Sequence, residues 1–492
     1  MPRLLLQAEN RPGIAGVAYD TGWLAGVAAT EDRRVSRFPT SLRWLADHQL
    51  SDGSWGSSVR YEHDRILCTL AALAPLAQFG RREADRQAVE QGTRYLWQHG
   101  HLLGKEPVEL VGFELLLPTL VERARLAGVA VPPHLDIYSA ARARKLELLP
   151  PHALYSARTT AVHSLEFLGE QADLARLPDA QGHNGSIGNS PAATAFFLDH
   201  IENSRAAAYL GSCLDWTGGA TAPVLHPCET FELLWSAYHL FLGGAPASAL
   251  LSKSDRAHLR TALAAGGVSL SPTFPIPDAD DTAVALLLLH TLGEPVNPRV
   301  LEAFEGKDGS FVSFPYERHS SVGVNLHVLH ALLKVPGYPA ARRSINRIVD
   351  YLADQHSGLY WIDKWHISPL YATAHAVLVL DELPTNPIQH LVEQSREWLR
   401  HVQNADGSWG FYGQPTAEET AYGLLALTAG AYDPRDAARC AAAARYLQQV
   451  RDEEFPPLWI DKCLYTPPLI VGAAIDAALT TWIRRSTGPE RS

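Results

Sequence analysis

The sequence predicts an all-α protein built from two α/α-barrel domains, and three observations carry this prediction. Apolar residues with helical spacing recur along the 492 residues. Alternating runs of Val, Ile and Thr, which are typical of strands, are scarce. One turn motif occurs in almost the same form at Gln49–Gly56 and at Gln403–Gly410. Because the two copies lie far apart, they favour two homologous helical barrels over a single one.

The predicted helices are stretches in which apolar residues recur at positions i, i+3, i+4 and i+7. Clusters of Pro and Gly separate them, as at Pro150–Pro151, Gly218–Pro227 and Phe455–Pro457. Repeated antiparallel pairs of such helices close into toroids or stack into solenoids. The clearest candidates are Ile66–Gln78, Val111–Ala127, Thr230–Leu242, Asp281–Leu292, Ser321–Leu333, Ala372–Leu380, Glu418–Ala429 and Ala437–Val450.

The repeated turn motif is expected to staple successive helices together. In Gln49-Leu-Ser-Asp-Gly-Ser-Trp-Gly56, the Asp-Gly pair ends a helix and supplies a residue that tolerates positive φ. The Gln amide can bond free backbone groups at the turn, and the Trp covers the helix end with a large flat face. A second phrase, Trp-Ile-Asp-Lys, occurs at Trp361–Lys364 and again at Trp459–Lys462.

Composition and charge exclude several classes of function. The chain has 42 basic and 53 acidic residues and a formal charge of −11, whereas nucleic acid binding needs clustered cations. The five cysteines are odd in number and lack CxxC spacing, which argues against a disulfide framework or a cysteine-built zinc site. No apolar run has the length of a signal-peptide core or a membrane span. We therefore expect a cytoplasmic protein with no nucleic acid partner and no transmembrane segment.

The segment Pro277-Asp278-Ala279-Asp280-Asp281-Thr282 is the candidate for chemistry. Burial and like charge raise a carboxyl pKa, whereas the helix N-terminus favours the anions nearest to it. The expected result is one neutral carboxylic acid beside ionised neighbours. Such an acid can protonate an alkene if aromatic faces stabilise the cation, and the chain has 12 Trp, 17 Tyr and 14 Phe. A solvated loop, a helix N-cap and a metal site are the alternatives.

Asp278-Ala-Asp280-Asp281 resembles the DxDD motif of class II diterpene cyclases, and the two Gln…Gly-Trp turns resemble the QW motifs that this family shares with squalene-hopene cyclases. Other matching segments occur in order along nearly the whole chain. The nearest likeness is to the short bacterial enzymes that form labdane or clerodane skeletons. The further matches are Ala18–Trp23, Gly112–Glu114, Lys145-Leu146, His163–Glu166, Phe231-Glu232, Asn325–His327, Asp363–His366, Ala417–Thr420 and Leu458–Lys462.

The resemblance implies the γβ arrangement of two α-barrels with the active site between them. Residues 1–30 would supply the first helix of the β domain. Residues 31–215 would form the inserted γ domain, and residues 216–492 the β domain that carries DxDD.

The resemblance also implies roles for individual residues around the acid. Asp280, the middle Asp of the motif, would donate the proton, and Asp278 and Asp281 would tune it. Asn325 matches a family asparagine that bonds the acid, and Ser321 places a hydroxyl four residues before it. These bonds would orient the proton and keep the carboxyl neutral.

Further roles concern the diphosphate, a metal ion and the end of the reaction. Lys145 matches a family lysine that contacts the diphosphate, and Glu106 and Glu109 stand where the family carries an acidic Mg²⁺ motif. His163 matches a histidine that holds a terminating water in plant ent-copalyl enzymes. The Asn that accompanies it there is missing, because the aligned residues are Pro223-Val224, and a valine cannot hold water. Another base or a delayed deprotonation is therefore expected.

The function that the resemblance implies is protonation-initiated bicyclisation of geranylgeranyl diphosphate to a labdane-, halimane- or clerodane-type diphosphate. The chain lacks the Asp-rich motif that would ionise the diphosphate, which favours its retention and a downstream class I terpene synthase as partner. A drimenyl diphosphate synthase acting on farnesyl diphosphate is the nearest alternative. Others are a squalene-hopene cyclase, an (α/α)-barrel glycosidase, a protein prenyltransferase subunit and a non-catalytic prenyl-binding protein.

Overall fold

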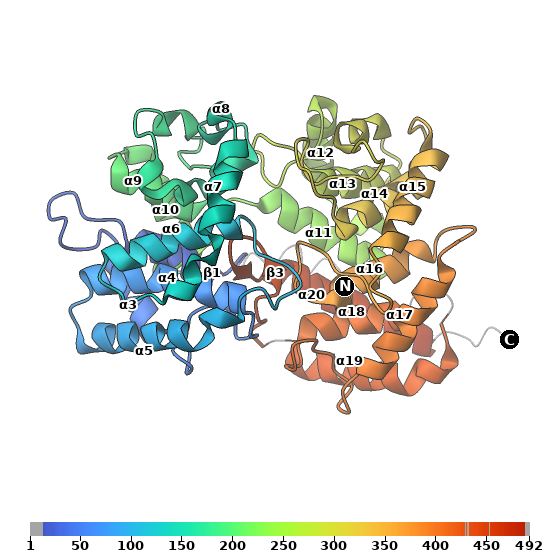
Figure 1. Ribbon diagram of the computed structural model, residues 1–492. Helices are drawn as coiled ribbons and strands as arrows, with labels where there is room; N and C mark the ends of the chain where they lie inside the picture. The colour runs from blue at the N-terminus through green and yellow to red at the C-terminus, as the bar shows by residue number, and fades with distance from the viewer. Residues whose placement is uncertain (1–12, 429, 431, 452, 488–492) are drawn as a thin grey trace.

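The computed structural model describes residues 13–428, 430, 432–451 and 453–487 and confirms the all-α prediction. Two helical lobes lie side by side, the N-terminal one blue to green and the C-terminal one yellow to red (Figure 1). Within the described chain the strands are short antiparallel pairs, in which β1 (Gly16–Val17) pairs with β2 (Ala222–Pro223) and β3 (Trp459–Ile460) with β4 (Leu464–Tyr465). No described helix is long and apolar enough to cross a membrane.

The N-terminal lobe is a barrel with an inner and an outer layer of helices. Around its inner ring, α2 packs on α4, α4 on α6, α6 on η3, η3 on α9 and α9 on α2, so that the ring closes. The remaining helices lie outside this ring. The elements are α2 (Ala18–Ala25), α3 (Pro39–Asp47), α4 (Glu62–Phe79), α5 (Glu83–His99), η1 (Gly100–Leu102), α6 (Phe113–Leu126), η2 (Pro133–Tyr138), α7 (Ser139–Leu148), α8 (Pro151–Leu154), η3 (Thr160–Gln171), η4 (Leu177–Ala180), α9 (Pro191–His200) and α10 (Ser204–Trp216).

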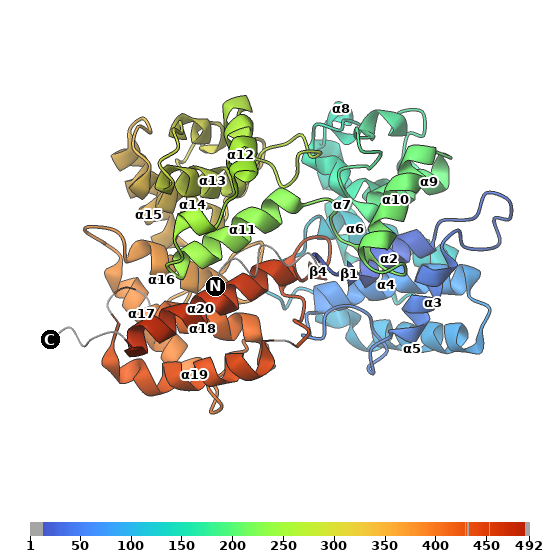
Figure 2. The same cartoon turned by 180° about the vertical axis from the view of Figure 1, so that it is seen from behind.

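The C-terminal lobe is a second barrel of the same kind. Its inner ring runs α11, α13, α14, α16, α18, α20 and back to α11, and each helix packs on the next. Figure 2 shows α11 and α20 side by side where this ring closes. The elements are α11 (Glu229–Leu242), η5 (Ala247–Ala249), α12 (Lys253–Ala265), α13 (Ala279–Thr291), η6 (Pro298–Phe304), α14 (Val322–Lys334), α15 (Ala341–Asp354), α16 (Pro369–Leu380), α17 (Gln389–Val402), α18 (Ala417–Thr428), η7 (Pro434–Asp436), α19 (Ala437–Val450) and α20 (Pro468–Thr487).

The sequence decides which helix lies in which layer. The inner helix α13 is apolar on all sides, and residues 281–289 are buried without a break. The outer helix α15 is amphipathic and buries only Ser344, Ile348, Val349 and Leu352, which share one face. Each inner helix that the periodicity predicted is present within a few residues of its expected ends.

The turn motifs staple helices as predicted. Gln49 Nε2 donates to the carbonyls of Gly53 at 2.7 Å and Ala88 at 2.9 Å, and Gly53 has a φ of 89°. The Trp55 indole is 1% exposed and donates to the carbonyl of Leu45, at 2.7 Å. Gln403 repeats these contacts at Gly407 and Arg439. The amide of each motif therefore ties one turn to the next outer helix.

The lobes do not follow the predicted domain boundaries throughout. Helix α2 packs on α3, α4 and α9, so residues 18–25 belong to the N-terminal barrel. The assignment of residues 1–30 to the β domain would place them in the C-terminal barrel. The small residues of α2 cause its placement in the N-terminal barrel, because Gly22 lies against the backbone of Ala71 on α4, where a Cβ would come within 2.5 Å. Residues 1–12 of that assignment lie outside the described residues. The predicted boundary between the γ and β domains, at residues 215/216, falls at the end of α10, and the first helix of the C-terminal barrel, α11, begins at Glu229.

A hairpin from the C-terminal lobe joins the two barrels. The Leu464 amide donates to Asp64 of α4 at 2.8 Å, and the Val111 amide donates to the carbonyl of Asp461 at 3.0 Å. The Lys462 side chain is fully buried and donates to Glu166 Oε1 at 3.1 Å. The residues around β3 and β4 therefore form both a wall of the C-terminal barrel and the seam between the lobes.

Candidate active site

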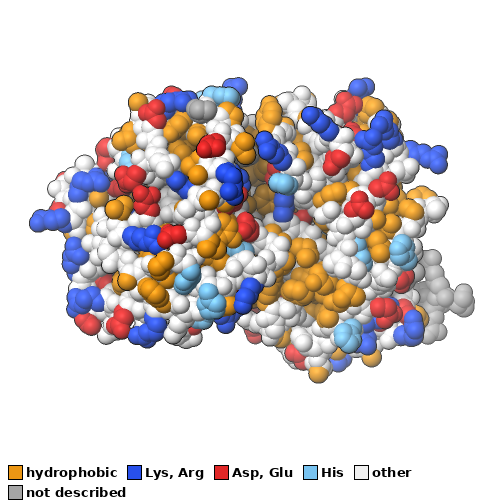
Figure 3. All heavy atoms as spheres, viewed as in Figure 1, with side chains coloured by type: hydrophobic (Ala, Val, Ile, Leu, Met, Phe, Trp, Pro, Cys, Tyr) orange, Lys and Arg blue, Asp and Glu red, His pale blue; other side chains and the backbone are white. Residues whose placement is uncertain are grey.

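A cavity lies between the barrels, and both lobes line it. Figure 3 shows the surface hollowed between the two lobes, with Lys, Arg and His side chains beside the hollow. The N-terminal lobe contributes residues of η3 and the segment before α6, and the C-terminal lobe contributes the N-terminal parts of its inner helices and the β3–β4 hairpin. The polar and ionisable side chains of the lining are Thr160, His163, Ser164, Asp278, Asp280, Asp281, Ser313, His327, Asp363 and Asp461.

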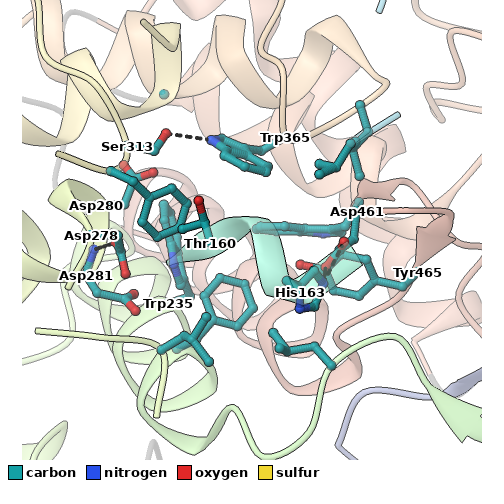
Figure 4. A pocket seen from close by; sticks show the side chains of 18 of the residues that line it. Thr160, His163, Trp235, Asp278, Asp280, Asp281, Ser313, Trp365, Asp461 and Tyr465 are labelled. Atoms are coloured by element: carbon teal, nitrogen blue, oxygen red, sulfur yellow. Dashed lines mark hydrogen bonds and ion pairs between the residues drawn. The ribbon is translucent and has the colours of Figure 1, made fainter. Parts of the chain in front are cut away.

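The three acids of the predicted motif meet at one end of this cavity, at the start of α13 (Figure 4). Asp278 is the N-cap, and its Oδ1 accepts the amide proton of Asp281 at 2.7 Å. Asp281 is 2% exposed, and neither of its oxygens has a hydrogen-bond partner. Asp280 keeps 15% of its side chain accessible. The backbone therefore gives each carboxyl a different position although they lie within four residues.

Asp280 is paired with a histidine from the neighbouring inner helix. Nδ1 of His327, on α14, lies 2.7 Å from Oδ1 of Asp280. His327 is 2% exposed, and burial lowers its pKa to about 3, so the imidazole is neutral. Its Nε2 has no partner. One oxygen of Asp280 is thus held by a neutral imidazole, and a proton on the other oxygen is free to face the cavity.

The predicted hydrogen bond from Asn325 to Asp280 is absent, and the Ser321 hydroxyl does not contact Asp280 either. The Asn325 amide bonds the backbone of Phe311 and the carbonyl of Ser321, while Ser321 Oγ donates to Asp363 Oδ1 at 2.5 Å. The reason is helical geometry, since Asn325 and His327 are two residues apart and point to different sides of α14. Because His327 faces Asp280, Asn325 points away from it. Ser321 lies four residues before Asn325, so the two side chains are on the same face of α14.

Burial favours the neutral form of Asp280 as predicted, but the negative charges that add to this effect come from residues outside the triplet. Burial raises its pKa well above the usual value, and the charges of Asp363 and Glu317 raise it further. Lys364 acts against them. Burial also raises the pKa of Asp278, to about 7, and that of Asp281 well above its usual value. The prediction of ionised neighbours within the triplet is therefore not met, because burial favours the neutral form of all three.

Among the neighbouring charged groups, Asp363 has the largest effect on the pKa of Asp280. It accepts hydrogen bonds from Ser321 Oγ, from the Gly323 amide at 2.9 Å and from the Trp365 amide at 3.2 Å. These three hydrogen bonds hold the carboxyl of Asp363 at the N-terminal end of α14. A charge that is fixed at the start of α14 therefore disfavours a second negative charge on Asp280.

Aromatic faces make up much of the remaining wall. Trp365 and Trp459 line the cavity, whereas Trp361 and Trp409 are fully buried staples and Phe411 is 38% exposed on the surface. Trp365 Nε1 donates to Ser313 Oγ at 3.1 Å, which fixes the plane of its ring. The other aromatic residues of the wall are Phe231, Trp235, Phe274, Phe314, Tyr371 and Tyr465.

His163 lies at the other end of the cavity and is paired with Asp461 (Figure 4). Its Nε2 is 3.1 Å from Oδ1 and 3.2 Å from Oδ2 of Asp461, and its Nδ1 is 2.9 Å from the carbonyl of Gly188. Both ring nitrogens thus face acceptors. The pair joins η3 of the N-terminal lobe to the hairpin of the C-terminal lobe.

The structure does not bring the predicted diphosphate and metal residues into the cavity. Lys145, on α7, forms an ion pair with Glu114 and is absent from the lining. Glu106 accepts a hydrogen bond from the Glu62 amide at 3.1 Å, and Glu109 accepts a hydrogen bond from the Tyr138 hydroxyl at 2.8 Å. The one group of metal-ligand atoms found among the described residues, Asp64 with Cys68 and Cys463, includes neither glutamate. Because one or two carboxylates with waters and substrate phosphates can hold Mg²⁺, a site at Glu106 and Glu109 stays a prediction.

The sequence analysis assigned no role to two side chains of the candidate site, His327 and Asp461, although a signal for each was present. His327 lies inside the matched segment Asn325–His327. Asp461 occupies the same place in the second Trp-Ile-Asp-Lys phrase as Asp363 does in the first. The residues that follow the first phrase pair with the second phrase, since the Ile460 amide donates to the carbonyl of Trp365 at 2.8 Å. The repeat therefore sets one carboxylate at each end of the cavity.

The comparisons with known proteins agree with this fold and site. Residues 318–463 match the model of the squalene-hopene cyclase C-terminal domain. A type B diterpene cyclase of Mycobacterium tuberculosis is 32% identical, and the match covers 97% of either chain. A labda-7,13-dienyl diphosphate synthase of Streptomyces clavuligerus is 33% identical over 93% of this chain and 87% of its own. The solved structure of ent-copalyl diphosphate synthase from Streptomyces platensis has a TM-score of 0.79 at 29% identity, over 98% of this chain and 99% of that chain.

Identity at this level over whole chains removes the glycosidase, protein prenyltransferase and non-catalytic alternatives. The double barrel, the aromatic cavity between its halves and the buried acid at the start of α13 are what an enzyme needs to start a cyclisation with a proton. The chain therefore belongs to the family of bacterial class II diterpene cyclases.

Proposed function

We propose that this protein cyclises geranylgeranyl diphosphate to a labdane-, halimane- or clerodane-type bicyclic diterpenyl diphosphate and leaves the diphosphate in place. The observation that carries the proposal is Asp280, a carboxyl whose pKa is raised by burial and which faces an aromatic cavity. Two similar proteins, a labda-7,13-dienyl and an ent-copalyl diphosphate synthase, are named for diphosphate products, which supports retention of the diphosphate.

The first step is proton transfer from Asp280 to the terminal alkene of the substrate. The proposal assigns the neutral His327 tautomer with its proton on Nδ1, which donates to Oδ1 of Asp280 and leaves the proton to be transferred on the other oxygen. After transfer, the same imidazole hydrogen bond stabilises the new carboxylate. The carboxylate that remains and the carbocation that forms attract each other strongly in a buried site, because the local dielectric constant is low.

The cation then moves along the cavity as the two rings close. The faces of Trp235, Trp365 and Trp459 line this path, and each aromatic face contributes about 0.5–2 kcal/mol to a desolvated cation. A substrate that fills this apolar cavity would displace its water, which would otherwise capture the cation as an alcohol.

Retention of the diphosphate follows in this proposal from what the sequence lacks. It holds no Asp-Asp-x-x-Asp/Glu motif for the metal cluster that would ionise the group. Lys145 stays the candidate contact, and Mg²⁺ stays a proposed companion of the diphosphate, with Glu106 and Glu109 as its candidate ligands. A downstream class I terpene synthase and a cytoplasmic location likewise stay predictions.

The test is a product analysis with purified protein and three substrates, farnesyl, geranylgeranyl and geranylfarnesyl diphosphate, each with and without Mg²⁺. After phosphatase treatment, the product from geranylgeranyl diphosphate is expected to be a bicyclic alcohol with the same elemental composition as geranylgeraniol, the alcohol of the uncyclised substrate. Asp280→Asn is expected to lower the rate at least about 10³-fold, since an amide cannot supply the proton. Asp308→Asn, in a turn of the same lobe outside the cavity lining, is the matched control. A cyclic product from farnesyl diphosphate alone would support the drimenyl alternative and contradict the proposal.

A further inference from the structure

The cavity holds a second ionisable pair, His163 with Asp461, at the end opposite to the acids of α13 (Figure 4). Both side chains line the cavity, and they come from different lobes. Asp461 keeps 16% of its side chain accessible, so part of the carboxylate faces the space that the substrate would fill. The proposed acid chemistry at Asp280 leaves this pair without a role.

The hydrogen bonds define the charge of the pair. Nδ1 of His163 donates to the carbonyl of Gly188, and Nε2 faces the carboxylate of Asp461, so both nitrogens carry protons. Burial would raise the pKa of Asp461, but the charge of His163 and its hydrogen bonds bring it below the usual value. Burial would lower the pKa of His163, but Asp461 raises it. An imidazolium–carboxylate pair is the result.

The carboxylate has capacity left for one more proton. Asp461 accepts bonds from the Lys462 amide at 2.7 Å and from His163. A carboxylate offers about four lone-pair sites, so a site remains on the cavity side. Asp363, the other carboxylate held by several donors, lies beside Asp280 at the end where the proton enters. Asp461 is therefore the lining carboxylate that stands away from the proton donor.

We propose that Asp461 accepts the proton that ends the cyclisation. This inference rests on the proposed function and extends it. In the step, a C–H bond next to the cationic carbon breaks, its electron pair forms the new C=C bond, and the proton passes to the cavity-facing oxygen of Asp461. His163 stays protonated and fixes the position of the carboxylate. Over one turnover Asp280 loses a proton and Asp461 gains one, and exchange with solvent resets both.

The experiment compares wild type, Asp461→Asn and Asp461→Glu with geranylgeranyl diphosphate and resolves the products by mass spectrometry and NMR. The cation should still form in Asp461→Asn, so substrate consumption continues. Its fate should change, with at least a tenfold shift in product ratio toward water-captured alcohols or isomers with another double-bond position. Asp461→Glu keeps the ion pair but moves the oxygen, and it should shift the double bond even if the Asn variant does not fold.

Asp64→Asn is the matched control for damage to the seam between the lobes. Asp64 is also a buried carboxylate bonded to the hairpin, at the Leu464 amide, but it does not line the cavity. Its variant should lower the melting temperature and leave the product ratio unchanged. An unchanged ratio in both Asp461 variants, or complete loss of turnover in a folded Asp461→Asn, would overturn the inference while the proposed function stands. A wild type that forms no bicyclic diphosphate would overturn both.

Discussion

At the residue scale, neighbouring charges of opposite sign act on the proton of Asp280. Asp363 and Glu317 raise the pKa of this carboxyl beyond the effect of burial, and Lys364 lowers it. The acid works only in its neutral form, so the rate should fall on the alkaline side as Asp280 loses its proton. The position of that alkaline limb reports the balance of these charges.

Two substitutions should move the alkaline limb in opposite directions. Asp363→Asn removes a negative charge, lowers the pKa of Asp280 and shifts the limb to lower pH. Lys364→Gln removes a positive charge, raises that pKa and shifts the limb to higher pH. The measurement is kcat/KM against pH for both variants and wild type. Shifts of the same sign in both variants would contradict the electrostatic account.

The sequence could identify Asp280 but not its partner. The acids lie together in the chain and directly precede an apolar helix, so their burial follows from local sequence. The pairing with His327 depends instead on how α14 is rotated against α13, and that rotation is decided by packing across the barrel. The pairing of His163 with Asp461 joins residues 298 positions apart, and no local pattern encodes it.

At the scale of elements, the N-terminus of α13 fixes the acid in place. Asp278 caps this helix through its hydrogen bond to the Asp281 amide. Asp278→Ala should lower the free energy of unfolding by about 1 kcal/mol through loss of the cap, and Asp278→Asn should retain most of it, because Asn caps as well as Asp. Chemical denaturation of both variants checks this. Equal losses in both would show that the charge of Asp278, not the cap, stabilises the helix.

The helices and turns were predictable to different degrees. Inner helices such as α13 can be predicted from the sequence because all their sides are apolar. The Gln-to-Trp turns can be predicted because their residues form local hydrogen bonds. The β3–β4 hairpin gave no such signal, since strands of two residues are too short for an alternating pattern. Yet this hairpin carries Asp461 and Lys462 into the seam between the lobes.

At the scale of the whole molecule, a buried charge cluster holds the two barrels together. Lys462 of the hairpin is 0% exposed, as are Glu166 of η3 and Asp20 of α2, which lie 3.1 and 3.8 Å from its Nζ. Lys462→Met leaves these carboxyls buried without their cation, and the expected loss is about 3–5 kcal/mol of stability. Thermal unfolding measures it.

The matched control for that substitution is Lys307→Met, at an exposed lysine of the same lobe, which should leave the melting temperature nearly unchanged. A second substitution sharpens the test. Glu166→Gln added to Lys462→Met should restore part of the loss, because it removes one of the stranded charges. A double variant less stable than Lys462→Met alone would contradict the ion-pair account of the seam.

The most direct test of the central claim is the reaction run in D₂O. Since Asp280 exchanges with solvent between turnovers and gives its proton to the CH carbon of the terminal alkene, the cyclic product should gain one deuterium, located in the ring methylene next to the carbon that carries the two geminal methyl groups. Unreacted substrate should gain none, and Asp280→Asn should form no labelled product. A bicyclic product of unchanged mass would show that cyclisation does not begin with a proton from this acid, and would contradict the account.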